Sequence, residues 1–126
     1  MKARILLACA FVAATGIVVV GTGAAFAAAT GNEIRSAIAG NTVQGNMSAG
    51  GAYLEFYDPS GAIKGKDYVG QWSVEGDLMC FSYQATPKEC WNVEINGDQV
   101  RWIRNGAAQG TGTILHGNPN GLGKVP

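Results

Sequence analysis

Two cysteines, Cys80 and Cys90, carry the side chains most able to support redox chemistry or metal binding. Nine residues separate them, whereas redox and zinc sites favour the short C-x-x-C spacing. The third cysteine, Cys9, lies in an apolar N-terminal stretch and supplies no second pair. We therefore interpret Cys80 and Cys90 as a structural disulfide between neighbouring strands, and we expect no metal site.

Hydrolytic chemistry would need His116, the single histidine, as its base. Ser48, Ser73 and Ser82 are the candidate nucleophiles, but none lies in a G-x-S-x-G turn. The glycine-rich segment 106–113 has neither the lysine nor the following helix of a phosphate-binding loop, so it indicates a curved strand. We therefore predict no catalytic residue, no cofactor and a protein that is not an enzyme.

Aromatic side chains are the remaining functional candidates, because they can form the wall of a ligand cavity. The residues that we expect to line such a cavity are Trp72, Phe81, Tyr83, Trp91 and Trp102. The first hypothesis is a binding module for a small apolar or amphipathic ligand. The alternative is a packed interior in a protein-interaction module, such as an inhibitor or partner of another cell-envelope protein. Tyr53 and Tyr57 would then be exposed anchors, since aromatic residues are favoured at interface hot spots.

The elements that must position these residues are one short helix and a series of strands. A helix is expected over residues 30–40, with Ile34 and Ile38 on one face and Thr30 or Asn32 as its cap. Short β-prone runs follow at intervals of about ten residues, a pattern typical of an all-β sandwich or barrel. The expected strands are 41–46, 51–57, 62–66, 68–74, 78–84, 89–95, 98–104 and 109–115. We predict about eight antiparallel strands in a meander, forming a small barrel or strongly curled sheet.

Turn residues predict how these strands are aligned. Two-residue turns at Asn96-Gly97 and Glu75-Gly76, together with a loop at 84–86, each set the register of one hairpin. The loop at 84–86 places Cys80 opposite Cys90. The combined registers predict one inward row of Trp72, Met79, Trp91 and Trp102, with Val74, Val93 and Val100 beside it.

A fourth turn at 58–61 is typical of a type I turn with a bulged glycine. We take it to place Phe56 opposite Ile63 and Glu55 opposite Lys64, the latter as a cross-strand ion pair. Leu54, Phe56 and Ile63 would then face the interior. The opposite face would carry Tyr53, Glu55, Tyr57, Lys64 and Lys66.

The N-terminal residues resemble a secretory leader. Lys2 and Arg4 precede an apolar stretch, and Ala25-Phe26-Ala27 is an A-x-A cleavage sequence. A membrane anchor over 5–29 is the alternative, but no Lys/Arg cluster follows it. We expect a signal peptide at 1–27, one domain at 28–116, a C-terminal coil at 117–126, and a periplasmic or secreted protein without a membrane span after cleavage.

Composition excludes two further classes of protein. The formal net charge is zero, which argues against a nucleic-acid partner. Hydrophobic residues make up 47% of the chain and charged residues 14%, so the chain is not intrinsically disordered. The expected partner is therefore a small molecule or an envelope protein.

Gly70-Gln71-Trp72, the N-terminal helix and the eight-strand meander resemble a reduced lipocalin-like (calycin-type) barrel. The chain is also similar to small exported proteins of uncharacterised function from alphaproteobacteria. The segments that carry this likeness are 40–42, 57–61, 68–72, 79–83, 90–91 and 117–119. The resemblance implies a periplasmic lipocalin-like domain, in which Trp72 helps to close one end of the barrel. It implies no activity.

Overall fold

The computed structural model describes residue 16 and residues 27–124. This part of the chain has one helix, α1 (Gly31–Ile38), and nine strands. The strands are β1 (Ala27–Ala28), β2 (Asn41–Met47), β3 (Gly51–Tyr57), β4 (Ala62–Lys64), β5 (Val69–Glu75), β6 (Leu78–Tyr83), β7 (Glu89–Asn96), β8 (Gln99–Arg104) and β9 (Ala107–Leu115). The predicted all-β class with one short N-terminal helix is confirmed.

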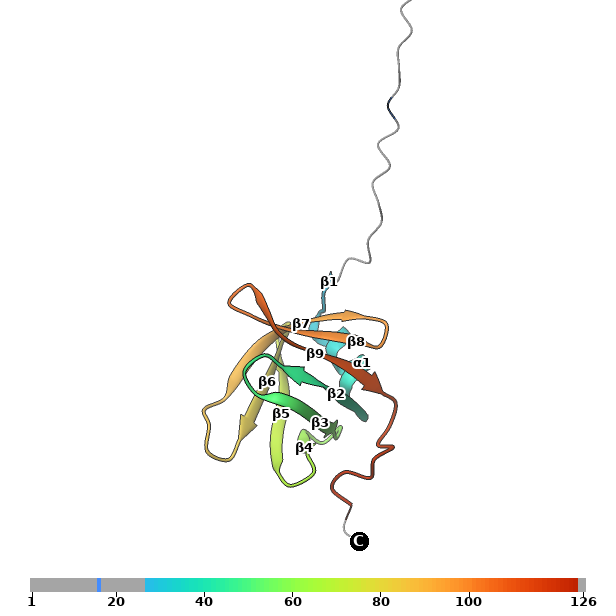
Figure 1. Ribbon diagram of the computed structural model, residues 1–126, viewed down its shortest axis with the longest axis vertical. Helices are drawn as coiled ribbons and strands as arrows, with labels where there is room; N and C mark the ends of the chain where they lie inside the picture. The colour runs from blue at the N-terminus through green and yellow to red at the C-terminus, as the bar shows by residue number, and fades with distance from the viewer. Residues whose placement is uncertain (1–15, 17–26, 125–126) are drawn as a thin grey trace, which may run out of the picture.

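Strands β2 to β9 form a closed antiparallel barrel (Figure 1). The sheet order is β1-β7-β6-β5-β4-β3-β2-β9-β8, and pairing of β7 with β8 closes it. The short β1 is an extra strand that pairs with the end of β7. Closure removes free sheet edges and leaves one interior to which every strand contributes alternate side chains.

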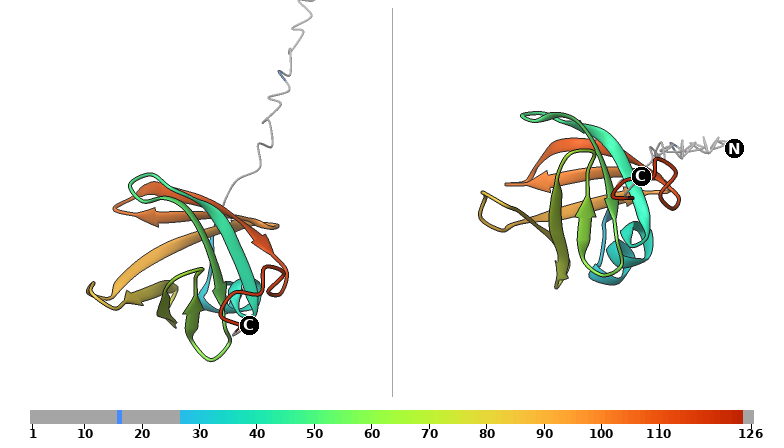
Figure 2. Two further views of the ribbon diagram at one scale, coloured as in Figure 1. Left: turned by 60° about the horizontal axis from the view of Figure 1, so that its bottom comes forward. Right: turned by 90° about the horizontal axis from the view of Figure 1, so that it is seen from below.

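The two ends of the barrel differ. Helix α1 lies at one end, which we call the helix end, together with the turns at 58–61, 76–77 and 97–98. The loops at 48–50, 65–68, 84–88 and 105–106 lie at the other, which we call the loop end. Figures 1 and 2 show α1 away from the β6–β7 and β8–β9 hairpins.

Helix α1 closes its end of the barrel with apolar side chains. The Thr30 hydroxyl accepts a 3.2 Å hydrogen bond from the Glu33 backbone N–H, which caps the first turn as expected. Ile34 and Ile38 are completely buried in the core. Asp77 Oδ1, from the β5–β6 turn, accepts a 2.9 Å hydrogen bond from the Gly31 N–H and so joins the helix to the barrel.

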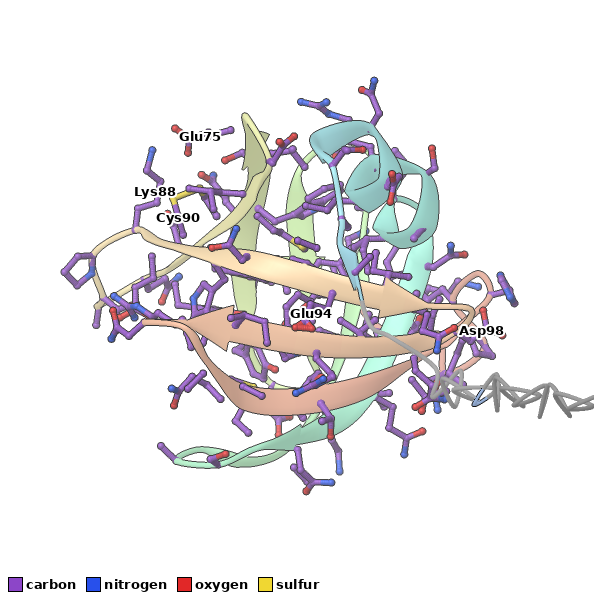
Figure 3. All side chains as sticks on the ribbon, turned by 90° about the horizontal axis from the view of Figure 1, so that it is seen from above. Glu75, Lys88, Cys90, Glu94 and Asp98 are labelled. Carbon is purple, nitrogen blue, oxygen red and sulfur yellow. A yellow bond between two sulfur atoms is a disulfide. The ribbon has the colours of Figure 1, made fainter. Side chains whose placement is uncertain are left out.

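The register of β6 and β7 is the predicted one. Met79 pairs with Trp91 and Cys80 with Cys90. The two cysteines form a disulfide, and their Cα atoms are 4.0 Å apart. The prediction of a cross-strand disulfide is therefore confirmed (Figure 3).

Two hairpins are displaced by one residue on each strand from the predicted register. The two-residue loops are Gly97–Asp98 and Gly76–Asp77, so Val93 and not Trp91 lies opposite Trp102. Each loop begins with a glycine at positive φ, which we had placed second. The partner of each residue therefore moves by two positions along the opposite strand. Because side chains alternate with a period of two, every side chain keeps its predicted face. The prediction that Trp91 lies beside Trp102 is wrong.

The β3–β4 hairpin is the third whose register differs from the prediction. Asp58 and Ala62 flank a three-residue loop at 59–61, and the Asp58 N–H donates a 2.8 Å hydrogen bond to the Ala62 carbonyl. Gly61, at φ 98°, belongs to that loop as the bulge residue. Tyr57 therefore pairs with Ile63, one residue away from the predicted partner Phe56.

A one-residue change in register turns a strand over. Tyr57 and Glu55 are 1% and 6% exposed on the interior face, whereas they had been placed outside. Leu54 and Phe56 lie on the other face, and the predicted Glu55–Lys64 ion pair is wrong. Lys64 Nζ instead lies 3.6 Å from Asp58 Oδ2.

Residues 116–124 follow β9 as bends and turns. The Thr42 hydroxyl donates a 2.8 Å hydrogen bond to the Gly117 carbonyl, and Leu122 is 8% exposed. Of the predicted leader, only Gly16 and Ala27 are among the described residues. Within the described part of the chain, no helix has the length and apolar character needed to cross a membrane.

Candidate functional site

A cavity of about 230 Å³ lies toward the loop end of the barrel interior. The aromatic side chains that line it are Tyr53, Tyr57, Phe81, Tyr83, Trp91 and Trp102. Met47 and Glu55 complete the inner wall, and the exposed residues Thr86, Pro87 and Glu89 lie at the mouth. Strands β2, β3, β6, β7 and β8 all contribute, so the cavity exists only because the barrel closes.

Four of the five residues expected to line a ligand cavity do so, and the fifth does not. Phe81, Tyr83, Trp91 and Trp102 are in its wall. Trp72 lies toward the helix end, where its indole N–H donates a 2.9 Å hydrogen bond to the Asp58 carbonyl. Trp72 therefore ties β5 to the β3–β4 turn instead of facing the cavity.

Tyr53 and Trp102 form the polar contact across the cavity wall. The Trp102 indole N–H donates a 2.7 Å hydrogen bond to the Tyr53 hydroxyl, which donates a 2.8 Å bond to the Thr111 carbonyl. Space for Tyr53 comes from β9, because a Cβ atom added at Gly112 would meet the Tyr53 hydroxyl and the Val43 side chain. The glycine-rich segment thus makes room for an aromatic ring. Burial of the Tyr53 phenol raises its pKa to about 12.

Glu55 is a buried carboxylate held by three tyrosine hydroxyls. Tyr57 donates a 2.6 Å hydrogen bond to Oε2, and Tyr68 a 2.7 Å bond to Oε1. Tyr83 lies 2.9 Å from Oε1 and 3.0 Å from Oε2. An ionised carboxylate has only acceptor sites, so three hydroxyl donors match its chemistry.

The three tyrosine hydrogen bonds are strong enough to stabilise the charge of Glu55 in the barrel interior. Burying an ion still costs several kcal/mol after relaxation of the protein. A hydrogen bond to a charged group contributes about 1.5–3 kcal/mol. Three such bonds are of the size needed to offset the loss of hydration, and each oxygen of the Glu55 carboxylate accepts at least one of them.

The same environment keeps the hydroxyls protonated. Desolvation is the largest cause that raises the pKa of Tyr57, Tyr68 and Tyr83 above the ordinary value, and the nearby Glu55 charge raises it further. These tyrosines therefore remain hydrogen-bond donors to Glu55 throughout the physiological pH range.

The mouth of the cavity carries a neutralised pair of charges. Arg104 Nη1 lies 3.1 Å from Glu89 Oε2, and the guanidinium lies 5.2 Å from the centre of the Trp91 ring. Neither lysine nor arginine is found among the described residues that line the cavity. The charge of Glu55 is therefore not balanced by a basic side chain among the described residues of the cavity wall.

A second group of potential ligands lies outside the barrel. Glu75, Cys80 and Cys90 bring a carboxylate and two sulfurs within 4.8 Å of one another, and Lys88 Nζ is 2.8 Å from Glu75 Oε2 (Figure 3). Both sulfurs belong to the disulfide, so neither is the thiolate that a metal requires. This group is therefore a disulfide beside a surface ion pair.

His116 is a surface residue. Its Nε2 lies 3.2 Å from Asp98 Oδ1, and its side chain is 76% exposed. Within residues 27–124, no serine hydroxyl is hydrogen-bonded to it. The described structure does not assemble the hydrolytic arrangement that the sequence had raised.

Tyr53, Glu55 and Tyr57 are the site residues that the sequence analysis missed. They follow the two-residue period of one strand, so all three face the same side. The pattern is visible in the sequence, but the wrong register assigned it to the outer face. The two tyrosines expected as exposed anchors for a protein partner are thus in the interior.

The fold and the site together define a closed β-barrel with an aromatic cavity at its loop end and a buried carboxylate in its wall. No protein-family model, no curated protein and no solved structure matches this chain.

Proposed function

We propose that the protein is an exported, non-catalytic, lipocalin-like binding module that holds a small apolar or amphipathic ligand in the aromatic cavity. The observation that carries this proposal is the cavity of about 230 Å³ with six aromatic side chains in its wall. Apolar walls with a few placed polar groups are typical of small-molecule sites. The volume lies just below the usual range for such sites, which favours a small ligand.

Binding is favoured over catalysis by the state of the polar groups. The Glu55 oxygens are occupied by tyrosine hydroxyls, and the Tyr53 hydroxyl is engaged with Trp102 and Thr111. A general base must reach the proton that it removes, and a nucleophile needs a base beside it. The polar side chains of this cavity are instead bonded to one another, which makes a rigid wall.

Export is supported by the leader-like N-terminus and by the disulfide. Disulfides persist in oxidising compartments such as the bacterial periplasm. A domain of this size buries a modest share of its surface, so the Cys80–Cys90 bridge supplements a small core. Periplasmic or secreted location belongs to the proposal.

A titration with a small amphipathic alcohol tests the binding function. We expect 2-phenylethanol to shift the backbone amide NMR signals of residues around the cavity. Phe81→Trp should weaken binding because the larger ring fills the cavity, whereas Ser82→Trp changes the neighbouring residue on the outer face and should not. Equal binding to both variants, or shifts confined to the outer surface, would contradict the proposal.

A further inference from the structure

We propose that the cavity takes a small organic ammonium ion, an inference that rests on the binding function proposed above. It follows from three properties of the cavity wall: the direction of its hydrogen bonds, its charge and the chemistry of its rings.

The hydrogen bonds of the wall leave acceptors for a ligand. Tyr57 and Tyr83 line the cavity, and both direct their hydroxyl hydrogens to Glu55. Each of these oxygens therefore keeps lone pairs with which it can accept a hydrogen bond from a ligand. The Trp102 N–H and the Tyr53 hydroxyl hydrogen are also used, by Tyr53 and by the Thr111 carbonyl. The best complement is a ligand that donates hydrogen bonds or carries a positively polarised surface.

The charge of the wall selects the same kind of ligand. Glu55 is 6% exposed, and the lining residues in the described part of the chain include neither lysine nor arginine. The nearby guanidinium of Arg104 is engaged by Glu89 at 3.1 Å. In an apolar, poorly hydrated interior, the carboxylate attracts a cation more strongly than it would in water and repels an anion.

The rings supply the third property. Phe81 and Trp102 meet edge to face with their centres 5.5 Å apart, and Tyr57 and Phe81 do so at 6.3 Å. Aromatic faces attract alkylammonium groups through the ring quadrupole. The chain already uses this attraction at the mouth, where Arg104 lies over Trp91 at 5.2 Å. A quaternary or protonated amine inside the cavity would meet aromatic faces and a carboxylate together.

Choline and its uncharged isostere 3,3-dimethyl-1-butanol separate the charge of a ligand from its shape. Both are titrated into the full chain, with the tryptophan indole NMR signals as readout. We expect choline to bind roughly tenfold or more tightly than the alcohol, the size of a desolvated cation–π contribution. Equal or tighter binding of the alcohol overturns the ammonium inference and leaves the proposed binding function standing. Binding of neither compound overturns both.

A variant pair tests the source of the preference. Glu55→Gln removes the interior charge while keeping the shape, and we expect it to abolish the preference for choline. Glu75→Gln makes the same change of net charge outside the barrel and should keep it. A preference that survives in folded Glu55→Gln overturns the role of the carboxylate. Where that variant does not fold, the comparison of the two probes on the unmodified chain still decides the inference.

Discussion

Tyr57 and Glu55 are two residues apart on strand β3, and the tyrosine hydroxyl donates a 2.6 Å hydrogen bond to the carboxylate inside the barrel. Their spacing places both side chains on one face of the strand. Pairing of β3 through β4 and β5 to β6 then brings Tyr68 and Tyr83 to the same carboxylate, from the β4–β5 loop and from β6. A local pattern thus supplies two members of the cluster, and long-range pairing supplies the others.

Tyr57→Phe should lower the free energy of unfolding by about 1.5–3 kcal/mol, because it removes a hydrogen bond to a buried charge. Tyr68→Phe should have a smaller effect, since Tyr68 is 43% exposed and water can replace its hydroxyl. Urea unfolding followed by circular dichroism measures both values. Equal losses for the two variants would contradict the buried position of Glu55.

Gly112→Ala should destabilise the barrel by about 1–3 kcal/mol, because the new methyl group would overlap the Tyr53 hydroxyl and the Val43 side chain. Gly50→Ala is the matched control. A Cβ atom there meets only the Met47 Cβ at 3.5 Å, an ordinary contact. Thermal unfolding should separate the two variants, and a harmless Gly112→Ala would mean that Tyr53 does not point inward.

Trp102→Ala should cost about 3–5 kcal/mol, as expected for a large buried side chain. Trp102 is 3% exposed, whereas Trp91 is half-buried at the cavity wall. Trp91→Ala should therefore cost less, because its ring already faces open space on one side. Chemical denaturation of both variants tests this order, and the reverse order would contradict the position of Trp91 at the open cavity wall.

Alkaline pH should destabilise the protein through its tyrosines. Tyr53 has its pKa raised to about 12 in the folded state, against an ordinary value near 10. Below the unfolded value both states are protonated, so this contribution is fully present. It is lost as pH rises from about 10 through the folded value, because the unfolded chain releases its protons first.

Tyr57, Tyr68 and Tyr83 have pKa values raised in the same direction, so they add to this effect. Tyrosinate absorbance should therefore appear together with unfolding, as followed by circular dichroism across alkaline pH. A tyrosine that ionised near its ordinary pKa while the barrel remained folded would argue against the cluster around Glu55.

The sequence predicted those parts of the fold that depend on local chemistry. The 84–86 loop and the cysteines set one register correctly, and residues 30–40 contain the helix that was expected. The β5–β6 and β7–β8 registers were each displaced by one residue per strand, but the inward or outward direction of each side chain was predicted correctly. Sequence reasoning thus placed Trp102 correctly in the interior without identifying its partner.

The site itself was harder to predict, because it depends on one turn and on closure. Taking all of residues 58–61 as the turn, whereas Asp58 is bonded to Ala62 and the loop is 59–61, moved Glu55 from the interior to the surface. Even with the right register, Tyr68 and Tyr83 lie 13 and 28 residues away along the chain, so their contact with Glu55 depends on the pairing of β3 through β4 and β5 to β6. Trp72 was correctly predicted to face the interior, but it lies toward the helix end and does not line the cavity.

The central claim is that a small ligand binds inside the barrel against its aromatic wall. The most direct measurement is the nuclear Overhauser effect between the methyl protons of bound choline and the ring protons of the protein. The account predicts contacts to Phe81 and Trp102, whose rings meet in the cavity wall. Contacts confined to the exposed pair Tyr68 and Val69 would contradict it.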